Sequence, residues 1–144
     1  MTATVNGQAW SSTVVPLVTG GATATLQQGA LLIAGVSIAL STTPEQTLSI
    51  FLVHPHLGAD SMSALNGLNQ NTGSFLYGTN TNDIYVSTLS FSLTMTNVGS
   101  INITKYDTTN KLISGTFNFS ATQKDTSSHT MTVTNGSFYN VGWK

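Results

Sequence analysis

The side chains best suited to chemistry lie close together near the middle of the chain: His54, His56 and Asp60. Two imidazoles and a carboxylate are common ligands of zinc and similar ions. Pro55, between the two histidines, has no backbone N–H to donate to a neighbouring strand. It therefore favours a position for the two histidines at the end of a strand. A fourth ligand would have to come from elsewhere, and His129 is the remaining histidine. We interpret His54, His56 and Asp60 as candidate binding residues at a strand-to-loop junction, and we predict no metal site there.

The sequence gives no support for catalysis. Acid–base catalysis needs paired titratable groups whose environments separate their pKa values. Most of the acidic residues fall instead in predicted turns or strand starts, where they act as turn formers. No Gly-x-Ser-x-Gly elbow or phosphate-binding glycine loop occurs, and the absence of cysteine removes thiol nucleophiles. We therefore expect a protein that is not an enzyme, with no catalytic residues and no cofactor. The acidic residues are Glu45, Asp60, Asp83, Asp107 and Asp125.

The composition excludes several classes of partner. Only 6% of the 144 residues are charged, the net charge is -1, and there are four basic residues. Nucleic-acid binding draws its affinity from clustered Lys and Arg, so we do not expect it here. Too few basic residues are present for a basic patch that binds a membrane surface. The longest apolar run, residues 30–40, is too short for a membrane-spanning helix and is interrupted by Gly35 and Ser37. Thr, Ser and Asn exceed a third of the chain and must cover its surface with hydroxyl and amide groups.

Apolar residues recur with a period close to 2, which indicates strands. The best hairpin joins residues 101–104 to residues 113–121 through turn residues at 106–111. A second hairpin joins residues 31–40 to residues 48–53, and both of these segments have apolar side chains on both faces. We expect about nine or ten strands in a single domain covering residues 1–144.

Three segments are harder to interpret from their pattern. Residues 61–68 have the apolar spacing of a short helix, and the alternative is an irregular loop over residues 54–73. In the stretch 83–97 the apolar residues change from even to odd positions, which would put them on opposite faces of one strand. A bulge or break near residues 87–90 is therefore needed to keep them on one buried face. An Asn-Gly pair at 135–136 predicts a bulge or turn in the last strand.

Together these patterns favour an antiparallel β-sandwich of two packed sheets. A closed or partly open β-barrel of lipocalin type is the alternative. Gly7 and Trp10 form a G-x-x-W that is close to, but does not match, the G-x-W that opens such barrels. A large apolar pocket would favour the barrel, and a filled core would favour the sandwich.

Two segments carry a resemblance to a known family. Residues 2–10, Thr-Ala-Thr-Val-Asn-Gly-Gln-Ala-Trp, resemble the opening of small exported lipoproteins from Bacteroidota. The motifs I-T-K-Y-D at residues 103–107, I-S-G-T-F-N-F at 113–119 and T-N-G-S-F at 134–138 look like their closing pattern. The function of that family is unknown, so the resemblance implies a β-rich fold and an exported, lipid-anchored protein.

The resemblance and the composition lead us to expect a non-catalytic exported or cell-surface binding or accessory domain. Its partner would be a protein or glycan at the cell surface. If Met1 is not the natural start, the natural precursor would be lipid-anchored at the outer-membrane surface or outside the cell. The alternatives are a self-assembling structural subunit of filament or virion type that associates through strand edges, and a barrel that binds a small apolar ligand.

Several motifs have both a functional and a structural interpretation. The N-x-[ST] triplets at Asn102, Asn118 and Asn135 are expected by chance in so Asn-, Ser- and Thr-rich a chain. The resemblance also implies O-glycosylation at Asp-[Ser/Thr]-x triplets in loops, of which Asp60-Ser61-Met62 and Asp107-Thr108-Thr109 are examples. Six Trp and Tyr residues could stack on sugars, but packing in the core and at sheet edges is the favoured interpretation. They are Trp10, Tyr77, Tyr85, Tyr106, Tyr139 and Trp143.

The alternation in residues 113–121 makes a testable prediction. Phe117→Ala and Phe119→Ala should each lower the free energy of unfolding by about 3 to 5 kcal/mol, because both rings lie on the apolar face and would leave cavities. Asn118→Ala, on the other face, should cost under about 1 kcal/mol. Urea unfolding of the three variants measures this, and equal effects would mean that the strand is buried on both faces.

Overall fold

In a computed structural model, residues 1–13, 21–38, 45–63, 71–77, 84–87, 97–123 and 129–144 are described. These ranges form eleven strands and contain no helix, so they contain no helix that could cross a membrane. The expected all-β, antiparallel fold is confirmed. The strands are β1 (Thr2–Val5), β2 (Gln8–Ser11), β3 (Ala22–Gln27), β4 (Ala30–Ser37), β5 (Gln46–Val53), β6 (Gly58–Ser63), β7 (Thr72–Tyr77), β8 (Ile84–Val86), β9 (Asn97–Asp107), β10 (Leu112–Gln123) and β11 (Thr130–Gly142).

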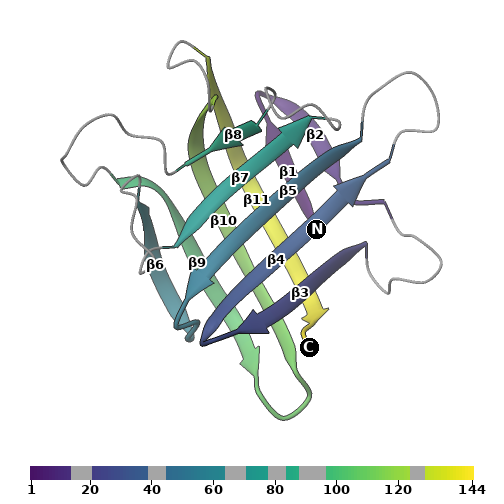
Figure 1. The fold of residues 1–144 in the computed structure, drawn as a ribbon, viewed down its shortest axis with the longest axis vertical. Coiled ribbons are helices and arrows are strands. Elements are labelled where there is room, and N and C mark those ends of the chain that lie inside the picture. Colours follow the sequence, from purple (N-terminus) through teal and green to yellow (C-terminus); the bar gives the residue numbers. More distant parts are fainter. Residues whose placement is uncertain (14–20, 39–44, 64–70, 78–83, 88–96, 124–128) are drawn as a thin grey trace.

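All eleven strands belong to one sheet (Figure 1). Its main path runs β2-β1-β11-β10-β8-β7-β5-β4-β3, and β9 and β6 branch from β10. The branch exists because β10 is long. Its first part, from Leu112 to Phe119, pairs with β9, and its last residues, Thr122 and Gln123, pair with β8.

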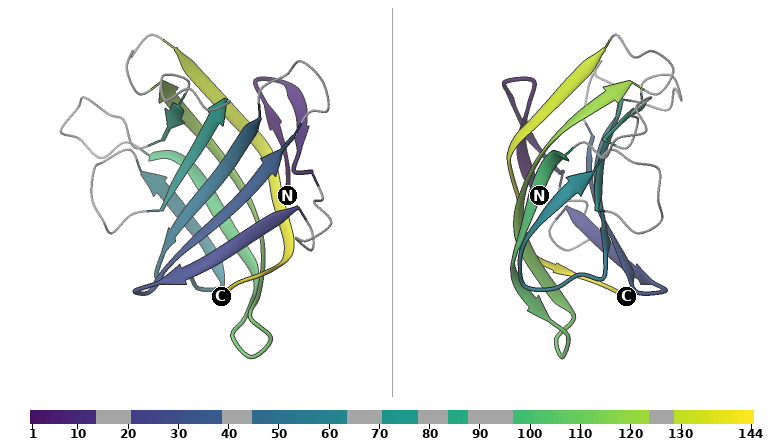
Figure 2. Two further views of the ribbon diagram at one scale, coloured as in Figure 1. Left: turned by 45° about the vertical axis from the view of Figure 1, so that its right-hand side comes forward. Right: turned by 90° about the vertical axis from the view of Figure 1, so that its left-hand side faces the viewer.

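The sheet curls so that its two halves face each other (Figure 2). One half contains β3, β4, β5 and β7, and the other contains β9, β10, β11, β1 and β2. Backbone hydrogen bonds join the two ends of the curl. The N–H of Leu26 donates to the carbonyl of Lys144 at 2.9 Å, and the N–H of Thr13 donates to the carbonyl of Val36 at 2.8 Å. The fold therefore has the two facing layers of a sandwich and the continuous sheet of a barrel.

Both predicted hairpins are confirmed. β4 and β5 pair in an unbroken antiparallel register, and β9 pairs with β10 around a turn that begins after Asp107. The Asp107 carboxylate accepts hydrogen bonds from the N–H of Asn110 at 2.9 Å and the N–H of Thr109 at 3.1 Å. The bond from the Asn110 backbone, with a second from its side chain, holds the pKa of Asp107 below its ordinary value.

The core contains aromatic rings that lie against glycines. Phe117 pairs with Gly136 of the neighbouring strand β11, where a methyl group on the glycine would overlap the ring. Phe119 reaches from β10 to Gly73 of β7, in the facing half of the sheet, where a methyl group would again collide with the ring. Because Phe117 and Phe119 are 3% and 2% exposed, the predicted buried face of β10 is confirmed.

The predicted irregularity at 135–136 is a β-bulge. Between the pairs Phe117–Gly136 and Phe119–Val133, β10 has one intervening residue and β11 has two. The extra residue is accommodated at Asn135, whose φ is 51°. Asparagine tolerates this left-handed conformation better than most residues, so the bulge follows from the local sequence.

The expected helix at residues 61–68 is wrong over residues 61–63. The alternative, an irregular loop over residues 54–73, is wrong over residues 58–63. Residues 58–63 form β6, which pairs with β9, while residues 64–70 lie outside the described ranges. Met62 is completely buried in the core, so the long-range pairing outweighs the local helical spacing. Ser61 therefore lies in a strand and not in the expected loop, whereas Thr108 is exposed in a turn as expected.

The contact between Gly136 and Phe117 predicts a non-additive pair of substitutions. Gly136→Ala should lower the free energy of unfolding by about 1 to 3 kcal/mol, because the new methyl group meets the ring. In a Phe117→Leu background the same change should cost less, since leucine lacks the outer ring atoms.

Gly142→Ala, also in β11, is the matched control. Its methyl group would meet only the carbonyl of Lys111, at 3.9 Å, so stability should change little. Denaturant unfolding of the single and double variants gives the coupling energy. Full additivity of Gly136→Ala and Phe117→Leu would contradict the proposed packing.

Candidate functional site

His54 follows the last residue of β5 and lies against the turn between β3 and β4. Its φ is 51°, and its N–H donates to the carbonyl of Gly29 at 3.1 Å. Gln28 and Gly29 both have positive φ, of 50° and 82°, which is typical of a tight two-residue hairpin turn. A methyl group on Gly29 would lie 3.8 Å from Cδ2 of the His54 ring. His54 is therefore held at this turn, as expected for a residue at a strand end.

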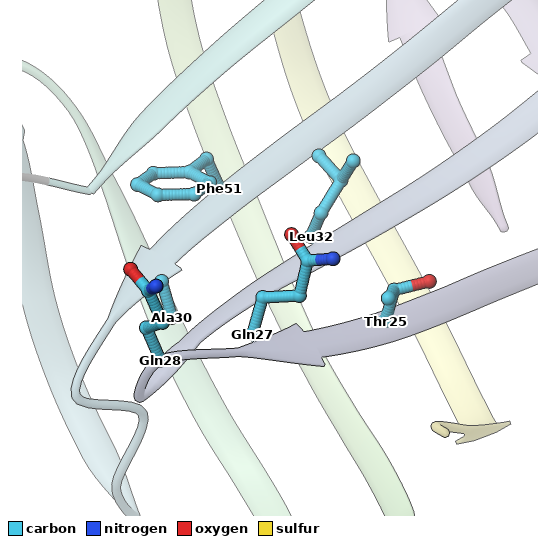
Figure 3. A pocket seen from close by; sticks show the side chains of 6 residues that line it. All are labelled: Thr25, Gln27, Gln28, Ala30, Leu32 and Phe51. Atoms are coloured by element: carbon cyan, nitrogen blue, oxygen red, sulfur yellow. The ribbon is translucent and has the colours of Figure 1, made fainter.

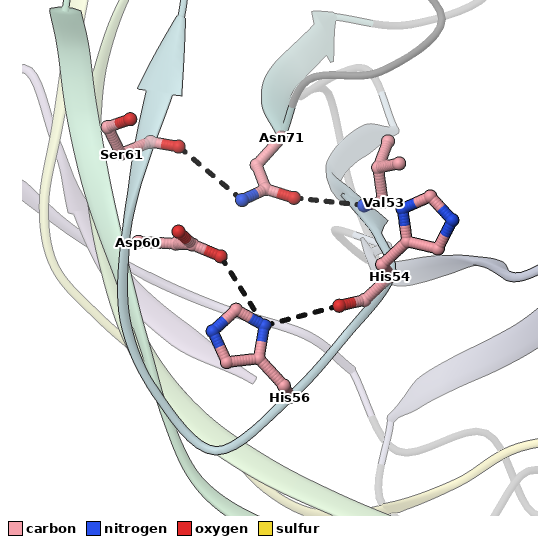
Figure 4. Close-up of polar contacts among 6 residues, drawn as sticks. All are labelled: Val53, His54, His56, Asp60, Ser61 and Asn71. Atoms are coloured by element: carbon pink, nitrogen blue, oxygen red, sulfur yellow. Dashed lines mark hydrogen bonds and ion pairs between the residues drawn. The ribbon is translucent and has the colours of Figure 1, made fainter.

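His56 and Asp60 are brought together, but His54 does not join them. The Nδ1 atom of His56 lies 3.7 Å from Oδ2 of Asp60 and 3.2 Å from the carbonyl oxygen of His54 (Figure 4). The His54 ring points away from this pair (Figure 4). The two side chains are 61% and 43% exposed, and exposed ion pairs contribute little to stability. Within the described ranges, no three His, Cys, Asp or Glu residues are grouped so that they could hold a metal ion.

A buried carboxamide connects β6 to β5 beside this pair. Asn71, which is 8% exposed, accepts a hydrogen bond from the N–H of Val53 at 2.9 Å. Its Nδ2 donates to the carbonyl of Ser61 at 3.4 Å (Figure 4). Asn71 thus satisfies backbone groups on two strands that have no ladder between them. Its role could not be predicted from the sequence, because an asparagine in a polar stretch gives no sign of burial.

The outer face of β3, β4 and β5 carries a groove of about 450 Å³ (Figure 3). Leu32 of β4 pairs with Phe51 of β5 on one side and with Thr25 of β3 on the other. The groove contains apolar, amide and hydroxyl side chains and no charged one. We call it the Phe51 groove, and its lining residues are Thr25, Gln27, Gln28, Ala30, Leu32 and Phe51.

Only one face of β4 and β5 is buried in the core, although both strands carry apolar side chains on both faces. Leu48, Ile50 and Leu52 face the core and are at most 2% exposed. Leu32 points to the opposite face from its neighbours Leu31 and Ile33 and is 44% exposed. The described part of the chain places no other layer over this outer face. The apolar residues on the second face were therefore the one sign of this surface in the sequence.

His54 borders the Phe51 groove. Its ring lies over Gly29, between the lining residues Gln28 and Ala30. Of the three candidate residues, His54 is thus adjacent to the groove, whereas His56 and Asp60 form a separate exposed pair at the start of β6.

Comparison with known proteins identifies the family. A domain of unknown function, DUF6252, matches residues 1–142. The chain belongs to the DUF6252 family. No curated protein and no solved structure matches it. The family match agrees with the resemblance to a family of unknown function.

The geometry of this DUF6252 protein predicts that it does not bind zinc at His56 and Asp60. Two ligands from an exposed pair leave the ion largely hydrated, and the His54 ring points elsewhere. Titration calorimetry with zinc should show no micromolar site in the natural protein. A site that appears in this titration and is lost in His56→Ala would contradict the prediction.

Proposed function

We propose that this DUF6252 protein is a non-catalytic binding domain that acts outside the cell membrane. Its partner, a protein or glycan of the cell surface, binds at the Phe51 groove. The observation that carries this proposal is the row Thr25, Leu32 and Phe51 on the outside of the curled sheet. An apolar strip bordered by polar side chains is typical of an interaction surface.

The packing of the interior favours an external site over a ligand inside a barrel. The rings of Phe117 and Phe119 extend into the interior and lie against glycines. A small apolar ligand would have to displace these rings, which are almost completely buried. The outer face needs no such rearrangement.

The composition supports a location outside the membrane. Charged residues make up only 6% of the chain, and hydroxyl and amide groups replace them at the surface. The motifs shared with exported Bacteroidota lipoproteins agree with this, and in that family a lipid anchor lies upstream of the domain. We infer that the natural precursor is exported and anchored in the same way.

The proposal predicts a crosslink that depends on the groove. A photo-crosslinking residue at Gln27, in the protein expressed in its natural host, should capture one partner at the surface of intact cells. Leu32→Asp should abolish this product, because a carboxylate would lose its hydration in the apolar strip. Thr23→Asp, exposed on β3 outside the lining residues, is the matched control and should leave the product unchanged.

External protease applied to intact cells tests the location. A protein that resists protease until the cells are lysed would contradict export to the surface. Identical crosslinked products from Gln27 and from the exposed turn residue Thr109 would show that the Phe51 groove is not the binding site.

A further inference from the structure

The three N-x-[ST] triplets come together in space. In a strand, residues two apart point to the same face, so each triplet places a carboxamide and a hydroxyl side by side. Asn102, Asn118 and Asn135 all line one groove of about 330 Å³ on the outer face of β9, β10 and β11. We call it the asparagine groove. Its lining residues are Ser100, Asn102, Thr116, Phe117, Asn118, Asn135, Gly136 and Ser137.

Strand register and the β-bulge hold the polar groups of this groove in place. Thr116 pairs with Asn102 of β9 on one side and with Ser137 of β11 on the other. Asn118 pairs with Ser100, and its Nδ2 donates to the Ser100 hydroxyl at 2.8 Å. The groups are therefore part of the sheet and not of a loop. The asparagine groove is carried by β9, β10 and β11, which lie in one half of the curled sheet, and the Phe51 groove is carried by β3, β4 and β5. These two sets of strands belong to the two facing halves (Figure 2).

An exposed aromatic ring lies on the same strand. Trp10 and Trp143 are buried, as the packing interpretation expects, but Tyr139 is 82% exposed. Phe138 points into the core, so Tyr139 points outward, about 7 Å along β11 from Ser137. The next residue, Asn140, is held by a bond from its N–H to the buried Ser114 hydroxyl at 2.8 Å, which fixes the backbone beside the ring.

We propose that the asparagine groove and Tyr139 form a binding site for a neutral glycan. Carboxamides and hydroxyls both donate and accept hydrogen bonds, so they match sugar hydroxyls in either orientation. None of the lining residues is charged, and the Lys105 ammonium next to Tyr139 already donates to Oδ1 of Asn140 at 3.1 Å. A charged ligand in the groove would therefore lose hydration without a compensating partner. An aromatic ring offers an apolar face to the C–H groups of a pyranose. This site is distinct from the Phe51 groove and goes beyond the function proposed above.

The experiment uses an array of neutral and acidic polysaccharides, followed by calorimetry with an oligosaccharide of the best-bound one. Binding should be confined to neutral glycans. Asn118→Ala and Tyr139→Ala should each weaken it by about 3- to 10-fold, the loss of one contact, and both variants should stay folded at the temperature of the measurement. Tyr139 is so exposed that its variant tests the site even if Asn118→Ala were unstable.

Two matched controls separate this site from its surroundings. Thr132→Ala lies on the outer face of β11 beyond the lining residues, and Thr23→Ala lies on β3 outside both grooves; neither should alter glycan binding. Phe51→Ala is measured beside them. The proposal would be overturned if the protein bound no neutral glycan on the array, or if it preferred acidic glycans. A loss in Phe51→Ala alone would also overturn it and would place the glycan in the Phe51 groove, in agreement with the function proposed for that groove.

Discussion

The packing of Phe117 and Phe119 against glycines is the constraint on which the curled sheet depends. The two rings project from β10 to the inside, where Gly136 lies beneath one and Gly73 of β7 faces the other. Larger residues at these glycines would push β7 and β11 away from the rings. Because the inside is occupied in this way, both of the binding surfaces that we propose lie on the outer faces of the sheet. The Phe51 groove and the asparagine groove are both outer surfaces.

Local sequence patterns predicted much of the fold. Alternation in residues 113–121 identified the buried face of β10, and an aspartate followed by polar residues marked the turn before it. The bulge at Asn135 was also predicted, because an Asn-Gly pair favours left-handed backbone. These features depend on neighbouring residues, and for that reason a single sequence reveals them.

Features that depend on distant pairing were missed or misjudged. β6 exists because β9 lies beside it, and nothing within residues 58–63 indicates that partner. The exposure of Leu32 depends on what covers the outer face, which apolar content alone does not show. One by one, the three N-x-[ST] triplets carry no signal, because they are expected by chance in this composition. Their meeting in one groove follows from the register of β9, β10 and β11, which the sequence does not state.

Asn71 marks a junction of the fold that few backbone hydrogen bonds hold together. One carboxamide replaces a ladder between β5 and β6, so this junction has fewer backbone hydrogen bonds than the paired strands around it. Regions with sparse bonding open locally before the whole molecule unfolds. The N–H of Val53, held by a side chain, should therefore exchange with solvent deuterium sooner than the N–H groups in the centre of β10. The junction between β5 and β6 thus gives an otherwise continuous sheet a boundary between two units of local stability.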